Sequence, residues 1–158
     1  MKVAGGGFEQ CYNAQAVVDT ESMLVLAPEV TQAPNDKEQV TPMLEKVQAN
    51  PAGLNQPETW LADIGYYSEK NVAACVAADI KPLIAVKRDQ HHPGWRDRFI
   101  EPEPLAGDAS PVEIMKHTLK TCAGRAAYAL RKQTVEPVFG IIKSVMGFRQ
   151  FLLRGLEN

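Results

Sequence analysis

Residues 59–86 read TWLADIGYYSEKNVAACVAADIKPLIAV, and the order of their apolar and polar segments predicts a β-α-β unit. A short apolar strand ends before Asp63, a helix capped by Ser68 follows, and residues 82–86 form a second apolar strand. Crossovers of this kind are right-handed, so we expect the two strands to lie parallel in one sheet. Asp63 then stands at the carboxyl end of its strand, where open α/β sheets bind their ligands. The buried stripe of the helix is expected to be Val72, Cys75 and Val76.

The segment before this unit predicts a β-hairpin followed by a helix. Residues 12–30 contain two apolar runs separated by Asp-Thr-Glu-Ser, and polar Asn13 and Gln15 alternate with apolar neighbours in the first run. Asn35 or Asp36 can cap the helix that follows. Its buried stripe is expected at i, i+3, i+4 and i+7, namely at Val40, Met43, Leu44 and Val47.

The segment after the unit predicts a loop and then a helical C-terminal third. Residues 87–110 are charged, rich in proline and without periodicity for most of their length, which indicates a loop or insertion. Ser110 and Glu113 have the spacing of a capping box with proline between them, so a helix should begin there. The helical pattern continues past Gly124 to about residue 148, with weak points at Pro137 and Gly140.

Composition indicates a single soluble domain. Among the 158 residues, 45% are hydrophobic and 23% are charged, and no apolar run approaches the roughly 20 residues of a membrane span. We therefore expect a cytoplasmic protein that makes no contact with membranes. The three cysteines are far apart and never spaced C-x-x-C, so neither a disulfide framework nor a zinc site is indicated.

Charge is distributed unevenly along the chain. Residues 114–158 carry eight Lys/Arg against two Asp/Glu, a net charge of +6, whereas the remainder carries −8. A basic segment of this kind suggests a polyanionic partner such as nucleic acid, and a solvated charged face is the alternative interpretation.

Four polar side chains of the C-terminal helix are expected to share one face. At roughly 100° per residue of a continuous helix, this face carries Tyr128, Lys132, Glu136 and Lys143. A surface glutamate among basic residues is a common stabilising arrangement. The same face can also belong to a binding site, and helical spacing alone leaves both readings open.

Several separate blocks of sequence together resemble the catalytic domain of bacterial insertion-sequence DDE transposases. The blocks occur in the order found in that family and extend from about residue 7 to residue 156. They are CYNAQAVVDTES (11–22), VTQAPNDKEQ (30–39), LADIGYYSE (61–69) and RKQTVEPVFGIIKSVMGFRQFLLRG (131–155).

The resemblance implies a fold and a chemistry. The fold is a ribonuclease H-like α/β domain, with a mixed sheet and flanking helices. The chemistry uses three carboxylates and two divalent metals, Mg²⁺ or Mn²⁺, to cut DNA at transposon ends and join it to a target. Two in-line oxygens gather negative charge in such a reaction, and a metal pair stabilises both. The family also implies a homo-oligomer as the working form.

By motif, the resemblance implies that Asp63 and Glu136 are the second and third catalytic and metal-binding carboxylates. Lys143 corresponds to the lysine expected to touch transposon-end DNA. Tyr128 and Arg131 match the family's tyrosine and arginine in mutual spacing but sit one residue early, and Lys132 occupies the position expected for that arginine. All four are therefore candidate DNA-binding residues.

The family's first catalytic aspartate lies on a strand before the hairpin, and residues 1–10 contain no aspartate. Asp19 is read as a turn residue. We therefore expect residues 1–158 to form a partial DDE catalytic domain, truncated at the N-terminus and at the C-terminus, that binds metal weakly and is inactive alone. Without its central first strand, the sheet should either keep a gap of roughly 9–10 Å or bring the hairpin against the Asp63 strand.

Two other functions remain open from the sequence. One is a non-catalytic DNA-binding remnant that regulates transposition. The other is an unrelated metal-dependent phosphoesterase in which His91 and His92 join Asp63. The neighbouring Trp95 and its arginines are alternatively read as a DNA-contacting insertion, since aromatic rings stack on bases; the arginines are Arg88, Arg96 and Arg98.

Overall fold

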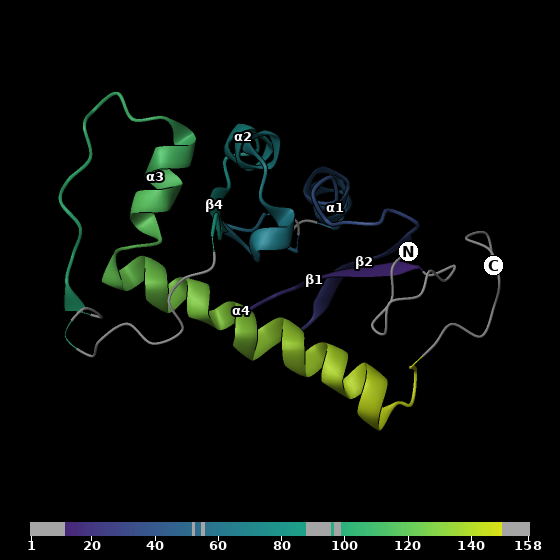
Figure 1. Cartoon of the computed structure of the whole chain (residues 1–158). Helices are drawn as coiled ribbons and strands as arrows, with labels where there is room; N and C mark the ends of the chain where they lie inside the picture. Colours follow the sequence, from purple (N-terminus) through teal and green to yellow (C-terminus); the bar gives the residue numbers. More distant parts are fainter. Residues whose placement is uncertain (1–11, 52, 55, 88–95, 97–98, 150–158) are drawn as a thin grey trace.

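The computed structural model describes residues 12–51, 53–54, 56–87, 96 and 99–149 (Figure 1). The segment containing His91, His92 and Trp95 lies outside the described residues. The regular elements, in chain order, are β1 (Asn13–Val18), β2 (Val25–Thr31), α1 (Val40–Gln48), β3 (Thr59–Ala62), the 3₁₀ turn η1 (Ile64–Tyr66), α2 (Glu69–Ala77), β4 (Lys81–Ile84), α3 (Pro111–Thr118), α4 (Cys122–Gly140) and the π-helical turn η3 (Ile141–Val145).

The predicted hairpin is confirmed. β1 pairs antiparallel with β2, in a register that places Ala16 opposite Pro28. Asp19 begins the connecting turn, where its Oδ2 accepts the backbone N–H of Ser22 at 2.7 Å. A hydrogen bond from the Ser22 hydroxyl, together with this backbone hydrogen bond, lowers the pKa of the Asp19 carboxyl. The prediction of Asp19 as a turn residue is therefore also confirmed.

The predicted β-α-β unit is confirmed in its order and direction. β3 and β4 pair in parallel, and the α2 crossover is capped by Ser68, whose hydroxyl accepts the N–H of Asn71 at 3.1 Å. Val72 and Cys75 are fully buried. The expected third member of the stripe, Val76, is 47% exposed, because α2 turns only a narrow face toward the core.

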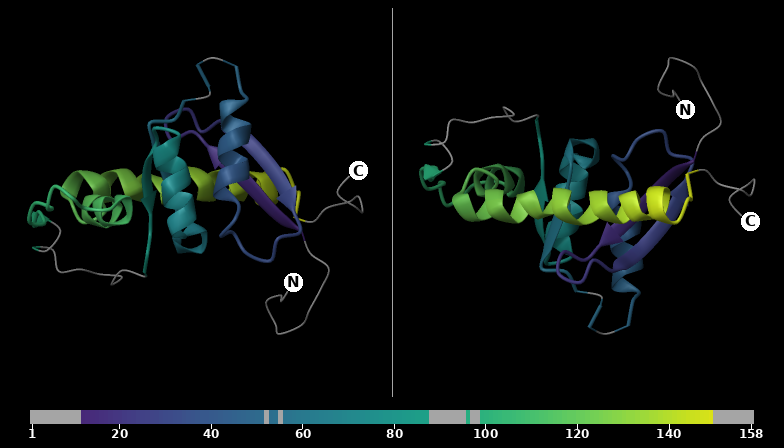
Figure 2. Two further views of the ribbon diagram at one scale, coloured as in Figure 1. Left: turned by 90° about the horizontal axis from the view of Figure 1, so that it is seen from above. Right: turned by 90° about the horizontal axis from the view of Figure 1, so that it is seen from below.

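The strands form two separate sheets among the described residues, β1 with β2 and β3 with β4. The hairpin therefore does not pair with the strand that leads to Asp63. Helices join the two sheets instead: α4 contacts both β1 and β3, and α1 contacts both strands of the hairpin and α2. In Figures 1 and 2, α4 runs across both sheets on the side opposite to α1 and α2. The described part is thus a mixed α/β arrangement with two small sheets between helical layers.

The C-terminal third contains two helices, so the prediction of one continuous helix is wrong. α3 begins with the predicted capping box, in which Ser110 and Glu113 exchange hydrogen bonds. α3 ends at Thr118, and α4 starts anew with Thr121 as its cap. Gly124 allows this sharp connection, since a Cβ at that position would lie 1.8 Å from the Thr118 carbonyl oxygen.

Pro137 does not interrupt the backbone where the sequence predicts a weak point. It lies inside α4, which continues to Gly140, the other predicted weak point. The irregularity comes one turn later, where residues 141–145 widen into the π-helical η3. The Met146 N–H accordingly bonds the Ile141 carbonyl, five residues back, at 2.9 Å.

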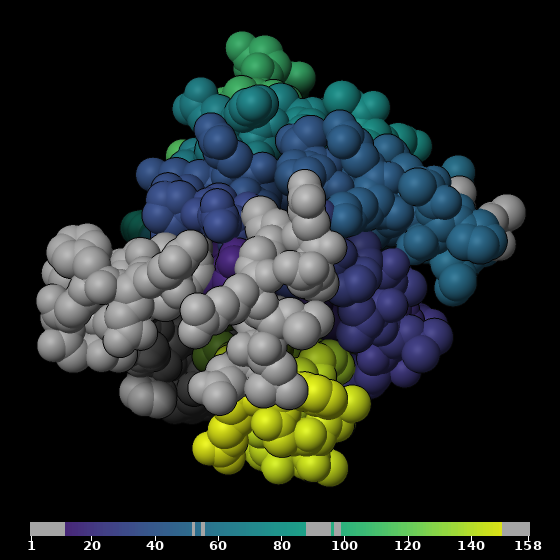
Figure 3. All heavy atoms as spheres, turned by 90° about the vertical axis from the view of Figure 1, so that its right-hand side faces the viewer, coloured from purple at the N-terminus to yellow at the C-terminus, as the bar shows by residue number. Residues whose placement is uncertain are grey.

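The core lies between α1, α2 and the two sheets. The predicted stripe of α1 is confirmed, because its four residues are all at most 4% exposed: Val40, Met43, Leu44 and Val47. Figure 3 presents the side of the molecule where α1 lies above the hairpin and the end of α4 lies below it. Within the part of the chain that is described, every helix is too short or too polar to span a bilayer.

Candidate functional site

A cavity of about 520 Å³ lies between the two small sheets and the helices that join them. β1 and β3 form two of its walls, through residues 15–18 and 59–62. Met43 of α1 and Gln39, which precedes that helix, also line the cavity, and the Asp63–Tyr66 turn closes one end. The wall supplied by α4 consists of Arg131, Thr134, Val135 and Glu136.

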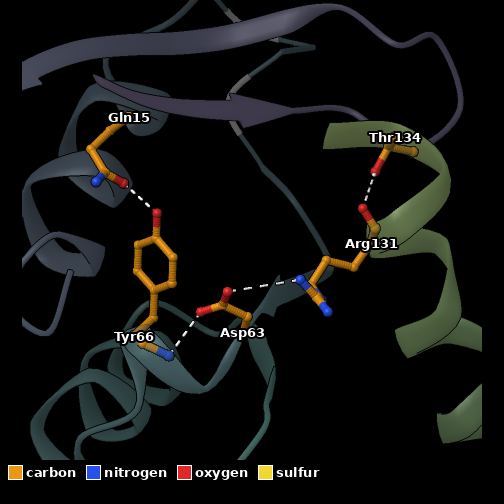
Figure 4. Close-up of polar contacts among 6 residues, drawn as sticks. Gln15, Asp63, Tyr66, Arg131 and Thr134 are labelled. Carbon is orange, nitrogen blue, oxygen red and sulfur yellow. Dashed lines mark hydrogen bonds and ion pairs between the residues drawn. The ribbon is translucent and has the colours of Figure 1, made fainter. Parts of the chain in front are cut away.

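Asp63 is held at this cavity by the backbone that follows β3. Its Oδ1 accepts the Gly65 N–H at 2.8 Å and thereby caps the η1 turn. Its Oδ2 lies 3.9 Å from Nη1 of Arg131, and 47% of the side chain is exposed. Figure 4 shows the carboxylate between the turn and Arg131. One oxygen is therefore fixed by the turn, while the other faces the guanidinium of Arg131.

A second carboxylate, Asp36, approaches the same turn. A Cβ built on Gly65 would lie 3.0 Å from Oδ1 of Asp63 and 3.4 Å from Oδ2 of Asp36, so the absent side chain of Gly65 leaves room for both acids. The negative charges of Asp36 and Asp63 both act on the hydroxyl of Tyr66. Burial, followed by the charges of Asp36 and Asp63, raises the pKa of the Tyr66 hydroxyl to about 12.

Two amide side chains of β1 hold Asp36 in place. Asn13 Nδ2 and Gln15 Nε2 each donate to Oδ1 of Asp36 at 2.7 Å. The Tyr66 hydroxyl in turn donates to Oε1 of Gln15 (Figure 4). The expectation that Asp36 caps α1 is wrong, since Gln39 occupies the cap position without a side-chain bond. The alternation of Asn13 and Gln15 along β1 is the sequence signal that points to this network, because residues at i and i+2 share one strand face.

Asn71 supports the structure of the candidate site and was not predicted from the sequence. It lies in α2 and is only 1% exposed. Its Nδ2 donates to the Lys37 carbonyl at 2.7 Å and to the Tyr66 carbonyl at 2.6 Å. A buried amide with two backbone acceptors ties the segment around Asp36 to the turn around Asp63. Its sequence context, the first turn of an amphipathic helix, carries no sign of this role.

Arg131 is the basic residue that the structure places beside Asp63. Its guanidinium also stacks over the Tyr128 ring, 5.3 Å from the ring centroid. Its Nε is buried and has no hydrogen-bond partner among the described residues. The neighbouring Lys132, which the motif placed in the expected register, is exposed and does not line the cavity. Consecutive residues of a helix point in directions about 100° apart, so Arg131 faces Asp63 and Lys132 does not.

Glu136 is exposed on α4 and borders the same cavity as Asp63. The inward side of α4 around it consists of Thr134 and Val138, which are 3% and 8% exposed. Lys143 is also exposed, in η3, with its Nζ 5.5 Å from the centroid of the Phe139 ring. The structure thus brings Asp63, Glu136 and Arg131 to one cavity and leaves Lys132 and Lys143 on the outer surface of the helix.

The donor set of the cavity suits a hard cation only in part. Carboxylate oxygens are the ligands that Mg²⁺ and Mn²⁺ prefer, and Asp63 and Glu136 supply them. Arg131 opposes a cation at Asp63, because it places a positive charge there already. No group of three or more His, Cys, Asp or Glu side chains with an arrangement for metal occurs among the described residues.

One comparison with known proteins finds a match. The family model described as a transposase DDE domain matches residues 2–158. No significant match was found among curated proteins or among solved structures.

Proposed function

The chain belongs to the transposase DDE domain family, and we propose that it works on DNA as part of a DDE transposase that cuts insertion-sequence ends and joins them to a target. The observation that carries this proposal is that Asp63, at the end of β3, and Glu136, on α4, line one cavity. Residues 73 positions apart are brought together by a strand end and a crossing helix. The family match supports the proposal that these two carboxylates belong to one site.

In this proposal Asp63 and Glu136 hold a divalent ion, Mg²⁺ or Mn²⁺. Such ions, when bound, stabilise the negative charge that gathers on the attacking and leaving oxygens of a phosphodiester. The Gly65 N–H fixes one oxygen of Asp63 and so presents the other to the ion. Arg131 neutralises Asp63 until DNA arrives, and its guanidinium then pairs with a phosphate, which it matches in geometry.

We also propose that the domain is of the ribonuclease H-like type. Support comes from an antiparallel hairpin and a parallel β-α-β unit packed on the same helix α4. The two sheets then correspond to parts of one larger mixed sheet.

The isolated 158-residue chain should not cut DNA, because two carboxylates hold a metal weakly and Arg131 competes for one of them. The experiment incubates the purified chain with supercoiled plasmid in Mg²⁺ and in Mn²⁺, beside the Asp63→Asn variant. We expect equal, background nicking from both proteins. Robust metal-dependent nicking by the wild-type chain that Asp63→Asn abolishes would show that the isolated chain is catalytically complete.

A second candidate function, DNA binding without catalysis, is favoured by the exposure of Lys132 and Lys143 on α4 and η3. Each phosphate contact releases counterions, so binding should weaken steeply with salt, and each lost contact should lower the slope of log K against log salt by roughly 1. Lys132→Gln and Lys143→Gln test this by fluorescence anisotropy with a labelled duplex. Lys70→Gln, on exposed α2, is the matched control. Binding that ignores salt would remove this candidate.

A further inference from the structure

Asp36 packs against the turn that carries Asp63, although the two residues are far apart in the sequence. A Cβ built on Gly65 would lie 3.4 Å from Oδ2 of Asp36 and 4.0 Å from its Cβ, so the aspartate lies directly beside the middle of the turn. The backbone of Asp36 is itself fixed, because its carbonyl accepts the N–H of Gln39 at 3.0 Å where α1 begins. Asp36 is therefore a fixed support beside the turn.

We infer that Asp36 is a positioning residue for Asp63: its carboxylate accepts hydrogen bonds that, through Gln15 and Tyr66, set the orientation of the turn from which Asp63 projects. Asp36 touches no reacting group in this assignment, so it acts entirely through its neighbours. The inference deepens the proposed function and rests on it in one respect, because the orientation of Asp63 matters to a cation only if Asp63 binds one. The contacts that carry it require neither metal nor DNA.

The carboxylate of Asp36 determines the direction of the hydrogen bonds around it. A carboxylate has no hydrogen to donate, so the amide nitrogens of Asn13 and Gln15 must both face its Oδ1, each at 2.7 Å. The same nitrogen of Gln15 also donates to Oδ1 of Asn13 at 2.9 Å. Gln15 therefore presents its carbonyl oxygen to Tyr66, whose hydroxyl must be the donor (Figure 4). The position of the Tyr66 hydroxyl thus depends on Asp36.

Tyr66 is held at both of its ends by the segment around Asp36. Its hydroxyl donates to Gln15, which is bound to Asp36. Its backbone carbonyl accepts a hydrogen bond from Nδ2 of Asn71 at 2.6 Å, and the same nitrogen donates to the carbonyl of Lys37 at 2.7 Å. Any tilt of Tyr66 would break one of these bonds in a partly buried place, where unpaired polar groups cost free energy. Tyr66 therefore keeps its turn aligned with that segment.

The turn orients Asp63 through two hydrogen bonds. The Tyr66 N–H donates to the Asp63 carbonyl at 3.2 Å, and the Gly65 N–H donates to Oδ1 of Asp63 at 2.8 Å. The second bond fixes the carboxylate directly, so a rotation of the turn changes the direction in which Oδ2 points. Groups that bind a metal have to be held within about 0.5 Å of their working geometry. A fixed turn is therefore a requirement for the proposed role of Asp63.

The amide of Gly65 reports the orientation of Asp63 without metal or DNA. Its exchange with solvent, measured by NMR on the full chain, should be roughly three- to ten-fold faster in Asp36→Ala than in the wild type, because its hydrogen bond to Asp63 is weakened. Asp36→Asn keeps an oxygen that both amides can use, so its exchange should stay within roughly two-fold of the wild type. Unchanged exchange in Asp36→Ala overturns the inference. Equally fast exchange in both variants also overturns it, since Asp36 would then act through its charge.

A second comparison separates positioning from a general loss of stability. The amide of fully buried Cys75 in α2 reports global opening, so the ratio of Gly65 to Cys75 exchange isolates the turn. Met115→Ala removes a side chain that is 2% exposed on α3, outside the cavity, and lowers global stability. The ratio should rise in Asp36→Ala and keep its wild-type value in Met115→Ala. An equal rise in both variants would mean that Asp36 has only a structural role.

Tyr66→Phe tests the route of the effect. This variant cuts the connection between Gln15 and the turn, so it should raise the exchange ratio roughly three-fold by itself. Asp36→Ala should then add less than about two-fold in the Tyr66→Phe background, because both changes act on one connection. Should Asp36→Ala not fold, Tyr66→Phe alone decides, and an unchanged ratio overturns the inference. Full additivity of the two changes also contradicts it.

Titration with Mn²⁺ distinguishes this inference from the proposed function. If both are correct, Asp36→Ala lowers the affinity for Mn²⁺ roughly three- to ten-fold, and Asp36→Asn lowers it less. If the wild type binds no Mn²⁺, the proposed metal site is wrong, whereas the exchange ratios still decide whether Asp36 positions Asp63. Wild-type affinity for Mn²⁺ in Asp36→Ala, together with rapid exchange at Gly65, overturns the functional part of the inference.

Discussion

The hydroxyl of Tyr66 donates a hydrogen bond to the side-chain carbonyl of Gln15, and this bond connects the two sheets across the cavity. Gln15 continues the connection by donating to Asp36, 2.7 Å away. The turn that carries Asp63 is thus positioned against the hairpin by side chains, since no strand pairing between the sheets exists among the described residues. The geometry of the site depends on this small polar network.

The Tyr66–Gln15 bond should be measurable in a double-mutant cycle of Tyr66→Phe and Gln15→Leu. Each variant leaves a buried polar partner unpaired, so each should lower the free energy of unfolding by about 1–3 kcal/mol. The two changes should be coupled by about 0.5–3 kcal/mol, because they remove the same contact. Urea unfolding followed by circular dichroism gives these values. Tyr67→Phe, next in the chain, is the control and should change stability little; strict additivity of the pair would contradict the predicted link.

Stability should fall at high pH because of Tyr66. Its pKa is raised to about 12 in the folded protein, whereas an unfolded tyrosine titrates near 10. The folded state therefore holds the proton more tightly, so the stabilisation is complete below about pH 10 and is lost as the pH rises to about 12. Two pKa units correspond to about 2–3 kcal/mol, and the loss should be smaller than this because solvent screens the partly exposed hydroxyl. Urea unfolding across this range measures it, and Tyr66→Phe should lose less stability than the wild type over the same interval. Parallel curves for the two proteins would contradict the assignment.

Substitution by alanine should lower the stability of the protein at Gly65 and raise it at Gly140. A Cβ at Gly65 would lie 3.0 Å from Oδ1 of Asp63, so Gly65→Ala should displace the carboxylate and cost about 0.5–2 kcal/mol through the lost cap. Nothing lies within 4 Å of a Cβ at Gly140, which has helical backbone angles. Gly140→Ala should therefore stabilise the protein by about 0.5–1 kcal/mol. Thermal unfolding of both variants provides the comparison. If Gly65→Ala stabilised the protein, the turn could not be as crowded around Gly65 as the structure indicates.

Removal of the Arg131 charge should strengthen the binding of divalent cations. The guanidinium lies 3.9 Å from Asp63, where it competes with a metal, and exposed pairs of this kind are worth up to about 1 kcal/mol. Arg131→Met should therefore raise the affinity for Mn²⁺ roughly three- to ten-fold. Titration with Mn²⁺ detected by electron paramagnetic resonance measures this affinity. Lys132→Met removes the same charge one residue away, on the exposed side of α4, and should have a smaller effect; equal effects would mean that Arg131 acts only through net charge.

Sequence reasoning predicted the local elements because their signals are local. The α1 stripe, the Ser68 cap and the capping box of Ser110 each depend on residues within one or two turns of helix, and all three are confirmed. The break between α3 and α4 was missed because Gly124 reads as an ordinary helical residue. Its meaning comes from the carbonyl of Thr118, which approaches from the preceding helix.

The candidate site was predicted in outline and missed in detail. Asp63 was placed correctly at the end of its strand, since a strand end is visible in the sequence. The hydrogen bonds of Asp36 and the ion pair between Arg131 and Asp63 were not predicted. An aspartate just before a helix is usually a cap, and only the tertiary partners Asn13 and Gln15 reveal another use here. A one-residue step on a helix rotates a side chain by about 100°, so motif spacing could not distinguish Arg131 from Lys132.

The wide turn of η3 has a consequence for how helical spacing is counted in this protein. In a regular helix, Glu136 and Lys143 are separated by about 700°, which returns them to nearly the same angular position. Residues 141–145 follow a π-helical pattern instead, in which each residue turns through a smaller angle about the helix axis than in an α-helix. Lys143 lies within this interval, so it does not return to the angular position of Glu136. A helical wheel of regular pitch therefore misplaces residues 141–145, Lys143 among them, relative to Glu136.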